Sequence, residues 1–318
     1  MIDIIIPAYN SKWNIEATVA SIVSQVIADK CKVTIVNDCS DYDYSYLIEQ
    51  YENILDIQEF ILSKNKGPGF ARQYAIERTN NPYIVFIDSD DIFMNVFSLA
   101  NLFEAISNNE KAAMIYASFL DEVSEGRYVQ GKSIMFTFHG AIYRREFIEK
   151  NDVRFLESRA NEDIGFNFQV LLKTDLNNEW VVDGINTYTY LRKFNKNSIT
   201  ASDPAKFHHL DGILGNVENR LFAFLKEDIN NEMIIERGCA SMADFYFYYL
   251  EMLEIKPEYK DEVLLALRKF YKLFGKHCLD NYSKDKLKDI LLIKQKAFEE
   301  DGSIFNKKME FDEFIELL

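Results

Sequence analysis

Three aspartates stand within four consecutive residues, directly after an apolar run that ends at Ile87. The carboxylates of Asp88, Asp90 and Asp91 would repel one another unless a cation neutralised them. A hard divalent ion suits such a cluster, because Mg²⁺ is normally held by one or two carboxylates plus substrate phosphate oxygens, and Mn²⁺ accepts similar ligands. The alternative is structural, with the aspartates capping a helix that begins near Asn95 or lining a solvated turn.

The elements that must position these aspartates follow from the pattern of apolar residues. Over the first hundred residues, short β-branched runs alternate with longer segments of helical period, which is typical of β-α units around a mainly parallel sheet. The expected strands cover residues 2–6, 32–36, 58–62, 83–87, 113–118, 133–137, 180–183 and 187–191. The sequence therefore predicts an α/β fold, with a Rossmann-like, mainly parallel sheet flanked by helices.

The last third of the chain lacks strand signals. After about Pro204, amphipathic helices are expected at residues 205–226, 231–253, 257–274 and 284–298. We therefore predict two domains, an α/β domain of residues 1–204 and a helical domain of residues 205–318. The aromatic run at residues 245–249 occupies every side of its helix, which indicates burial from more than one direction, in a helical bundle or a homodimer.

Ligands of open α/β sheets bind outside the carboxyl ends of the strands, so the residues that follow each expected strand are candidates for a site. These residues are polar or acidic after the strands at 2–6, 32–36 and 83–87. The first glycine of the chain is Gly67, so neither G-x-G-x-x-G nor the Walker loop can follow the first strand. This absence disfavours a dinucleotide dehydrogenase and a P-loop NTPase.

Composition excludes further classes of protein. The 318 residues carry 36 basic and 51 acidic side chains, a net charge of −15 that disfavours nonspecific binding to nucleic acid. The four cysteines show no zinc-ligand spacing, which indicates reduced thiols in a cytoplasmic protein. The sequence shows no secretory signal pattern and no apolar stretch that would span a membrane, so only peripheral contact at the inner face of the cell membrane is expected.

Six segments, in order along residues 1–200, resemble family 2 glycosyltransferases of the GT-A fold. The segments are residues 4–10 (IIIPAYN), 36–40 (VNDCS), 65–73 (NKGPGFARQ), 86–91 (FIDSDD), 161–166 (NEDIGF) and 190–200 (YLRKFNKNSIT). Two departures stand out. Many members carry Asp-Asp-Gly-Ser where this chain has Asn37-Asp38-Cys39-Ser40, and Gln73 replaces a frequent Asn. The retained second acid keeps base recognition by Asp38 plausible and puts a role for Asn37 in doubt.

The resemblance implies a nucleotide-sugar donor, most simply a UDP-sugar, lying across the strand ends. Asp38 would accept a hydrogen bond from the uracil N–H, Tyr9 would cover the base or ribose, and Pro7 would shape the first loop. Arg72 would contact the base edge or the diphosphate, since guanidinium forks match phosphate oxygens. The structural alternatives to these roles are that Tyr9 packs in the core and that Arg72 forms a surface ion pair.

The resemblance also implies a metal site and a general base. Asp90 would ligate Mn²⁺ or Mg²⁺, and Asp88 would contact the ribose or the metal. Asp163 would take the proton of an acceptor hydroxyl, with inversion at the anomeric carbon, while Glu162 holds the acceptor or orients the site. The alternative is that residues 161–163 cap the following helix, where acids are favoured.

Four further positions are candidates of lower rank. Ser198 and Thr200, with Arg192, would close over the diphosphate, although turn capping explains them almost equally well. His139 falls where acceptor and metal groups gather in related enzymes, and a lone histidine is more often structural.

The overall prediction is a metal-dependent inverting glycosyltransferase that acts on a glycan, a bacterial cell-surface polymer or a lipid-linked acceptor. Residues 256–296 carry 11 basic and 6 acidic side chains, which suggests a face for an anionic acceptor or membrane headgroups, or simply a solvated or subunit-contact face. Two other functions stay open: a non-catalytic adaptor with the same fold, and a sugar nucleotidyltransferase, whose glycine-rich N-terminal loop is missing here.

Overall fold

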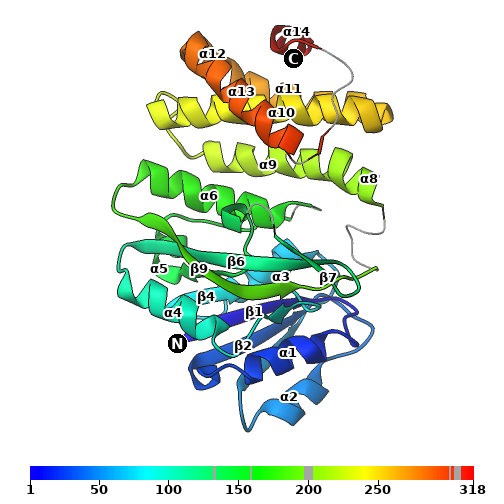
Figure 1. Ribbon diagram of the computed structural model, residues 1–318, viewed down its shortest axis with the longest axis vertical. Coiled ribbons are helices and arrows are strands. Elements are labelled where there is room, and N and C mark those ends of the chain that lie inside the picture. Colours follow the sequence, from blue (N-terminus) through cyan, green and yellow to red (C-terminus); the bar gives the residue numbers. More distant parts are fainter. Residues whose placement is uncertain (132–133, 158–159, 197–202, 301, 304–308) are drawn as a thin grey trace. The chain divides into compact units, whose positions relative to one another are not determined.

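The computed structural model describes residues 1–131, 134–157, 160–196, 203–300, 302–303 and 309–318 (Figure 1). The chain divides into two compact units. The first comprises Met1–Ser158 and Glu162–Asn195, and the second comprises Arg159–Asn161 and Lys196–Leu318. The predicted domain boundary near residue 204 remains a prediction.

A nine-stranded sheet runs through the first unit in the order β3-β2-β1-β4-β8-β6-β9-β5, with β7 paired to β6. The strands are β1 (Ile2–Ala8), β2 (Cys31–Asn37), β3 (Asp56–Ile61), β4 (Tyr83–Phe86), β5 (Ile92–Phe93), β6 (Ala112–Ser124), β7 (Arg127–Gln130), β8 (Ala141–Arg144) and β9 (Val181–Arg192). Strands β3, β2, β1 and β4 are parallel, as is the β6–β9 pair, whereas the pairings of β8, β5 and β7 are antiparallel. The predicted α/β class is confirmed.

Helices cover both faces of this sheet (Figure 1). They are α1 (Ile15–Val23), α2 (Ser45–Tyr51), α3 (Pro68–Ile76), α4 (Ser98–Asn108), α5 (Arg145–Lys150) and α6 (Glu162–Leu176), with short turns η1 (Ala28–Lys30) and η2 (Ile134–Phe136). Side chains alternate along β1, so Ile4 packs with α1, α2 and α4 while Ile5 packs with α3, α5 and α6. Burial on both faces explains why the β1 sequence is an unbroken apolar run.

The expected strand at residues 133–137 is wrong. Ile134–Phe136 form a single helical turn, η2. The buried Asn167 of α6 donates its Nδ2 hydrogens to the carbonyls of Met135 (3.2 Å) and Thr137 (2.7 Å), so a side chain takes hydrogen bonds that a strand would direct to a neighbour. The two short strands expected at residues 180–191 are one continuous strand, β9.

The second unit is helical, as predicted. Its elements are α8 (Pro204–Lys206), the π-helical turn η3 (Phe207–Asp211), α9 (Gly212–Phe224), α10 (Glu232–Ile255), η4 (Pro257–Tyr259), α11 (Lys260–Phe270), the π-helical turn η5 (Tyr271–Gly275), α12 (Lys276–Asp280), α13 (Lys284–Glu300) and α14 (Phe311–Leu317). The aromatic run of α10 packs on several sides within this unit, with Phe245 against Phe270, Phe247 against Phe298 and Tyr249 against Phe314. No helix among the described residues is both long and apolar enough to cross a bilayer.

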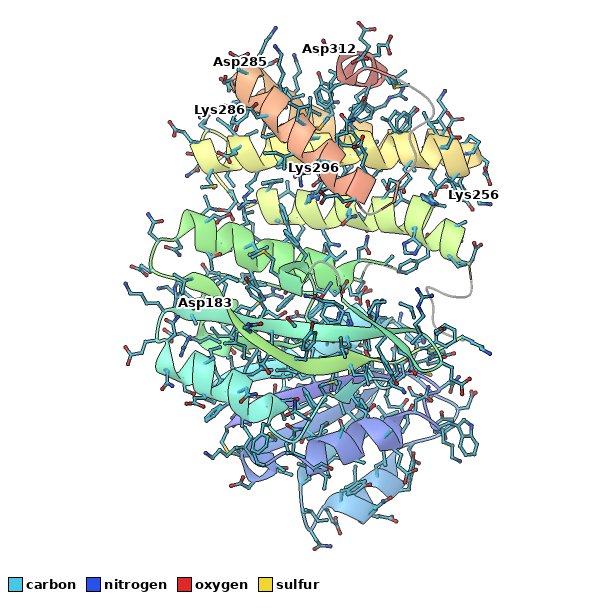
Figure 2. The ribbon with its side chains drawn as sticks, viewed as in Figure 1. Asp183, Lys256, Asp285, Lys286, Lys296 and Asp312 are labelled. Carbon is cyan, nitrogen blue, oxygen red and sulfur yellow. The ribbon has the colours of Figure 1, made fainter. Side chains whose placement is uncertain are left out.

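Ion pairs offset part of the basic excess at residues 256–296, because Lys294 and Lys296 pair with Asp244 and Glu300, which lie outside that segment. Ion pairs with acidic neighbours involve Lys256, Lys276, Lys288, Lys294 and Lys296. Figure 2 shows Asp285 and Lys286 together at the start of α13, so that end of the helix presents both signs of charge. The arrangement favours the interpretation of a solvated helix face.

Candidate active site

The loops that follow β1, β2 and β4 lie at one edge of the sheet, because these three strands are adjacent and parallel. The Asp38 N–H donates to the Ala8 carbonyl (2.8 Å), and the Ile87 N–H donates to the Ile5 carbonyl (3.1 Å). These bonds extend the pairing to the last residues of the strands. The structure therefore brings the neighbourhoods of Tyr9, Asp38 and Asp88 together, as predicted for parallel strands.

Asp38 anchors the loop that leads into α3. Its carboxylate oxygens accept hydrogen bonds from the backbone N–H groups of Lys66 (2.8 Å) and Gly67 (2.7 Å). Burial raises the pKa of Asp38, and these two hydrogen bonds partly offset the effect. Gly67 is left-handed (φ 87°), and Pro68 follows as the first residue of α3, where proline is well tolerated. The role of Asp38 toward a base stays a prediction.

Tyr9 is 55% exposed, so it is not a core aromatic and its ring is available to cover a ligand. Pro7 lies within β1 and is buried, two residues before this ring. Asn37, by contrast, is engaged in the local fold. Its Nδ2 donates to the Tyr42 carbonyl and to Glu59 Oε1, each at 2.9 Å, and its Oδ1 accepts from the Ser40 N–H.

Cys39 adopts a left-handed backbone conformation (φ 64°), which favours glycine. We expect Cys39→Gly to stabilise the first unit by about 0.5–1 kcal/mol, because relief of the left-handed strain exceeds the added entropy of the unfolded chain. Urea unfolding measures the effect. The matched control is Cys39→Ala, which removes the exposed thiol without relieving the backbone. Equal stability of the two variants would contradict the explanation.

The three aspartates after β4 have different partners. Asp91 is 1% exposed, and its carboxylate accepts from the Tyr190 hydroxyl (2.6 Å) and the Lys193 N–H (2.8 Å). Asp90 accepts from Asn195 Nδ2 (2.7 Å). Burial, followed by the charge of Asp88, raises the pKa values of both Asp90 and Asp91, and Asp91 is affected more strongly. The mutual repulsion expected from the sequence is therefore present.

A group that could hold a metal ion comprises Asp88, Asp91 and His139, whose ligand atoms lie within 4.8 Å of one another. This group differs from the predicted pair, since Asp88 belongs to it and Asp90 does not. His139 is buried against Phe138 and Phe119. Burial lowers its pKa to about 4, so its imidazole is neutral at pH 7, the form that binds metals.

Two observations show that this group fits a divalent cation. His139 Nε2 lies 3.9 Å from Asp88 Oδ2, so an imidazole nitrogen faces the carboxylates, while Nδ1 is buried and has no hydrogen-bond partner among the described residues. The charge of Asp88 raises the pKa of Asp91, and a cation would relieve this repulsion, although Arg72 already pairs with Asp88. The two carboxylates suit Mn²⁺ or Mg²⁺, and an imidazole ligand suits Mn²⁺ better, because Mg²⁺ prefers oxygen ligands.

Arg72 joins two carboxylates from distant parts of the sequence. Its Nη2 lies 2.5 Å from Asp88 Oδ1, and its Nη1 lies 2.7 Å from Glu162 Oε1. The side chain is 2% exposed, so the alternative of a surface ion pair is wrong. Burial alone would lower the pKa of Arg72, but Asp88 and Glu162 outweigh it and raise the pKa, which keeps the guanidinium charged.

Asp163 lies in the first turn of α6, beside Glu162. Burial and the charge of Glu162 raise the pKa of Asp163 to about 7, whereas Arg72 and the hydrogen bond from the Ile164 N–H oppose the shift. A carboxyl group with this pKa is partly ionised at neutral pH and can accept a proton under those conditions. Asn161 Nδ2 instead donates to the Gly212 carbonyl within the helical unit.

Ser198 and Thr200 lie outside the described residues. Arg192 is described and pairs with Asp121, while Lys193 next to it pairs with Glu122 (2.9 Å). These pairs tie the end of β9 to β6. The predicted closure over the diphosphate stays a prediction.

Tyr190 was missed as a site residue by the sequence reasoning. It is fully buried, its hydroxyl accepts from the Asp88 N–H (3.2 Å), and it donates to Asp91 Oδ2 (2.6 Å). The only signal was its place at the start of the YLR segment, because a tyrosine in an apolar strand is usually core. It orients the turn that carries the aspartates.

Comparison with known proteins agrees with this geometry. The model of the family described as glycosyl transferase family 2 matches residues 3–167. The poly(ribitol-phosphate) beta-N-acetylglucosaminyltransferase TarS of Staphylococcus aureus is 25% identical over 187 residues, covering 54% of this chain and 32% of that protein. The minor teichoic acid biosynthesis protein GgaA of Bacillus subtilis is 28% identical over 195 residues, 54% of this chain and 44% of GgaA. This chain thus spans less than half the length of either relative.

Solved structures share the fold. The crystal structure of S. aureus TarS 1-349 in complex with UDP-GlcNAc superimposes with a TM-score of 0.64 at 21% identity, covering 87% of this chain and 82% of that one. A mannosyltransferase from Pyrobaculum calidifontis, in complex with GDP-Man and Mn2+, gives a TM-score of 0.52 at 13% identity, covering 93% and 80%. The GT-A-type fold expected from the sequence is confirmed.

Proposed function

The chain belongs to glycosyl transferase family 2, and from this premise we propose that it transfers a sugar from a UDP-sugar to a hydroxyl group of a bacterial cell-surface polymer, with inversion and with the help of a divalent cation. The observation that carries the proposal is the meeting of Asp88, Asp91 and His139 at the strand ends, with ligand atoms within 4.8 Å of one another. Such a group is suited to binding a metal-diphosphate complex.

The donor would lie across the ends of β1, β2 and β4. Tyr9 would cover the base or ribose with its exposed ring, and Pro7 would shape the loop beneath it. Asp38 would accept a hydrogen bond from the uracil N–H, because its two hydrogen bonds to the loop leave a lone pair free. The UDP-GlcNAc complex of TarS supports a uridine nucleotide. Ser198 and Thr200 would complete the site from the segment after β9.

Asp88 and Asp91, with His139, would hold the cation, and Asp90 remains a candidate because its carboxylate belongs to the same turn. When bound, Mn²⁺ or Mg²⁺ would stabilise the negative charge that develops on the leaving diphosphate. Tyr190 would keep Asp91 in place through its 2.6 Å hydrogen bond.

Asp163 would be the general base. As the acceptor oxygen bonds to C1 of the sugar, the C1–O bond to the diphosphate breaks and its electron pair leaves on UDP, while the hydroxyl proton passes to the Asp163 carboxylate. Displacement from the face opposite the leaving group inverts the anomeric carbon. Glu162, tied to Arg72, would orient this end of α6.

The acceptor class is proposed from the relatives. TarS and GgaA bear names that connect them with teichoic acid-type polymers, whose units carry hydroxyl groups. A polymer, a glycan and a lipid-linked precursor present the same reacting group. We propose the polymer because both relatives point to it.

The proposed function is tested with the whole chain and a panel of UDP-sugars. We expect slow UDP release from one donor in the presence of Mn²⁺ or Mg²⁺, with mass spectrometry identifying the sugar lost. UDP plus the cation at about 100 times Kd should stabilise the fold by roughly 2.7 kcal/mol, which appears as a rise of several degrees in Tm. GDP with the same cation is the control. The absence of both UDP release and a Tm shift would exclude the proposal.

A further inference from the structure

We propose that Arg72 is a positioning residue that braces Asp88 and Glu162 against each other and does not bind the donor diphosphate. The inference itself comes from the geometry of the Arg72 side chain. Its kinetic consequences rest on the proposed function. It differs from the role that the sequence suggested, in which the guanidinium reached the base edge or the diphosphate.

Both terminal nitrogens of the guanidinium are paired with carboxylates. One terminal nitrogen lies 2.5 Å from Asp88 Oδ1 and the other 2.7 Å from Glu162 Oε1. Only Nε lacks a partner among the described residues, and it is buried. A side chain that is 2% exposed and pairs each terminal nitrogen with a carboxylate presents little surface to a diphosphate.

Aromatic rings enclose the same group. The guanidinium carbon lies 4.3 Å from the centroid of the Phe138 ring and 5.5 Å from that of Phe155. Phe155 in turn stacks on Phe166 of α6, with ring centroids 4.2 Å apart. Cation-π contacts that are shielded from water stabilise a charged guanidinium at this position. The two rings therefore help to hold the Arg72 side chain in one conformation.

A glycine one turn earlier allows the brace to form. Gly69 and Arg72 lie three residues apart and share a face of α3. A Cβ at Gly69 would stand 2.5 Å from the Leu156 carbonyl oxygen and 3.0 Å from Glu162 Cγ. The start of α3 therefore approaches the start of α6 more closely than any other residue type permits, and this approach brings Arg72 to Glu162.

Arg72, through its ion pairs with Asp88 and Glu162, connects the donor side of the proposed site to the acceptor side. Asp88 belongs to the donor side, and Glu162 adjoins Asp163 on the acceptor side. Among the described residues, the charged groups that act on Asp163 are Glu162 on its own helix, Arg72 on α3 and Asp88 after β4, and the neutral Tyr143 hydroxyl of β8 is a further titratable neighbour. Glu162 and Asp88 raise the pKa of Asp163, and Arg72 lowers it. Arg72 thus fixes the spacing of the two sides and supports ionisation of the base.

The test compares Arg72→Met and Arg72→Lys with wild type, using calorimetric binding of UDP with Mn²⁺ and the pH dependence of kcat. For Arg72→Met we expect kcat to fall about 100-fold from misplacement of the reacting groups, with UDP affinity unchanged or tighter because a cation repelling Mn²⁺ has been removed. The acid limb of kcat should move to higher pH. In Glu162→Gln the limb should move to lower pH.

Arg72→Lys separates charge from geometry. Lysine keeps the charge but cannot hold both carboxylates, so the acid limb should stay near wild type while kcat remains low. Arg78→Met is the matched control, because it removes the same charge from a partly exposed arginine just after α3. A UDP affinity weakened about tenfold or more in Arg72→Met and restored by lysine would show a diphosphate ligand and overturn the proposal.

Failure of the proposed function can be distinguished from failure of the brace. If the wild-type chain neither binds UDP nor releases it, the proposed function fails. The brace is then judged by urea unfolding of Arg72→Met, Glu162→Gln and the double variant. If Arg72 and Glu162 interact, the urea midpoint of the double variant shifts by less than the sum of the two single shifts. Additive shifts overturn the inference.

Discussion

Asp163→Asn is expected to reduce sugar transfer by about 10²–10⁴-fold, the usual contribution of a positioned general base. The amide has nearly the shape of the carboxylate but cannot take the proton of the acceptor hydroxyl. UDP binding should persist, because the donor contacts proposed here come from the strand ends. Transfer assays with the donor identified by the panel, together with calorimetric titration of UDP, provide the measurement.

The same substitution should change the pH dependence of stability. Since the pKa of Asp163 is raised to about 7 in the folded chain, mainly by burial, the folded state holds this proton more tightly than the unfolded chain does. The stability contributed by protonation is present at low pH and is lost as the pH rises through about 7. Asparagine cannot ionise, so the variant should melt above wild type at pH 8, with the gap closing toward about pH 4.

Asp56→Asn is a matched control, because it makes the same chemical change at an exposed residue at the start of β3. It should change neither transfer nor the pH dependence of Tm by a measurable amount. Transfer by Asp163→Asn within about threefold of wild type would remove Asp163 from the role of base.

Arg145→Met is expected to destabilise the first unit by about 3–5 kcal/mol, the cost of leaving a buried charge without its partner. The carboxylate of Asp3 is fully buried in β1, and Arg145 Nη2 reaches it at 2.8 Å. The same guanidinium donates to the carbonyls of Asn81 (2.6 Å) and Ile76 (2.8 Å) and to Thr79 Oγ1 (2.8 Å). One side chain therefore joins β1, α3, the loop before β4 and α5.

Urea unfolding at pH 7 measures this effect. The double variant Asp3→Ala, Arg145→Met should be less destabilised than the sum of the two single variants, because it leaves no lone charge in the core. Arg154→Met, at a half-exposed ion pair with Asp152, is the control and should cost less than about 1 kcal/mol. A loss below about 1 kcal/mol for Arg145→Met would show that the network contributes little.

The lengths and order of the main elements could be predicted because they depend on local pattern. The buried strands β1, β2 and β4 read as apolar runs, since both faces of the sheet are covered. The helices of the second unit follow from apolar residues at spacings of three and four. Where a side chain intervenes from afar, as Asn167 does at Ile134–Phe136, the local pattern misleads.

The candidate site, like the fold, was predictable from the sequence only in part. That Asp88, Asp90 and Asp91 follow a buried strand, and that Asp163 opens a helix, was decided by the sequence, because a residue's place in an element depends on its neighbours along the chain. The backbone of the turn decides which of those carboxylates point toward a common centre. A turn has no hydrophobic periodicity, so the sequence does not predict its conformation. It also depends on partners about a hundred residues away, such as Tyr190.

Tertiary structure alone decided that Arg72 holds Asp88 and Glu162 together and that His139 is buried beside the aspartates. Residues 72, 88, 139 and 162 meet only after α3, β4, β8 and α6 have packed around one aromatic core. Charges buried in such a core must find partners in space, and no spacing along the chain records which partner is near enough.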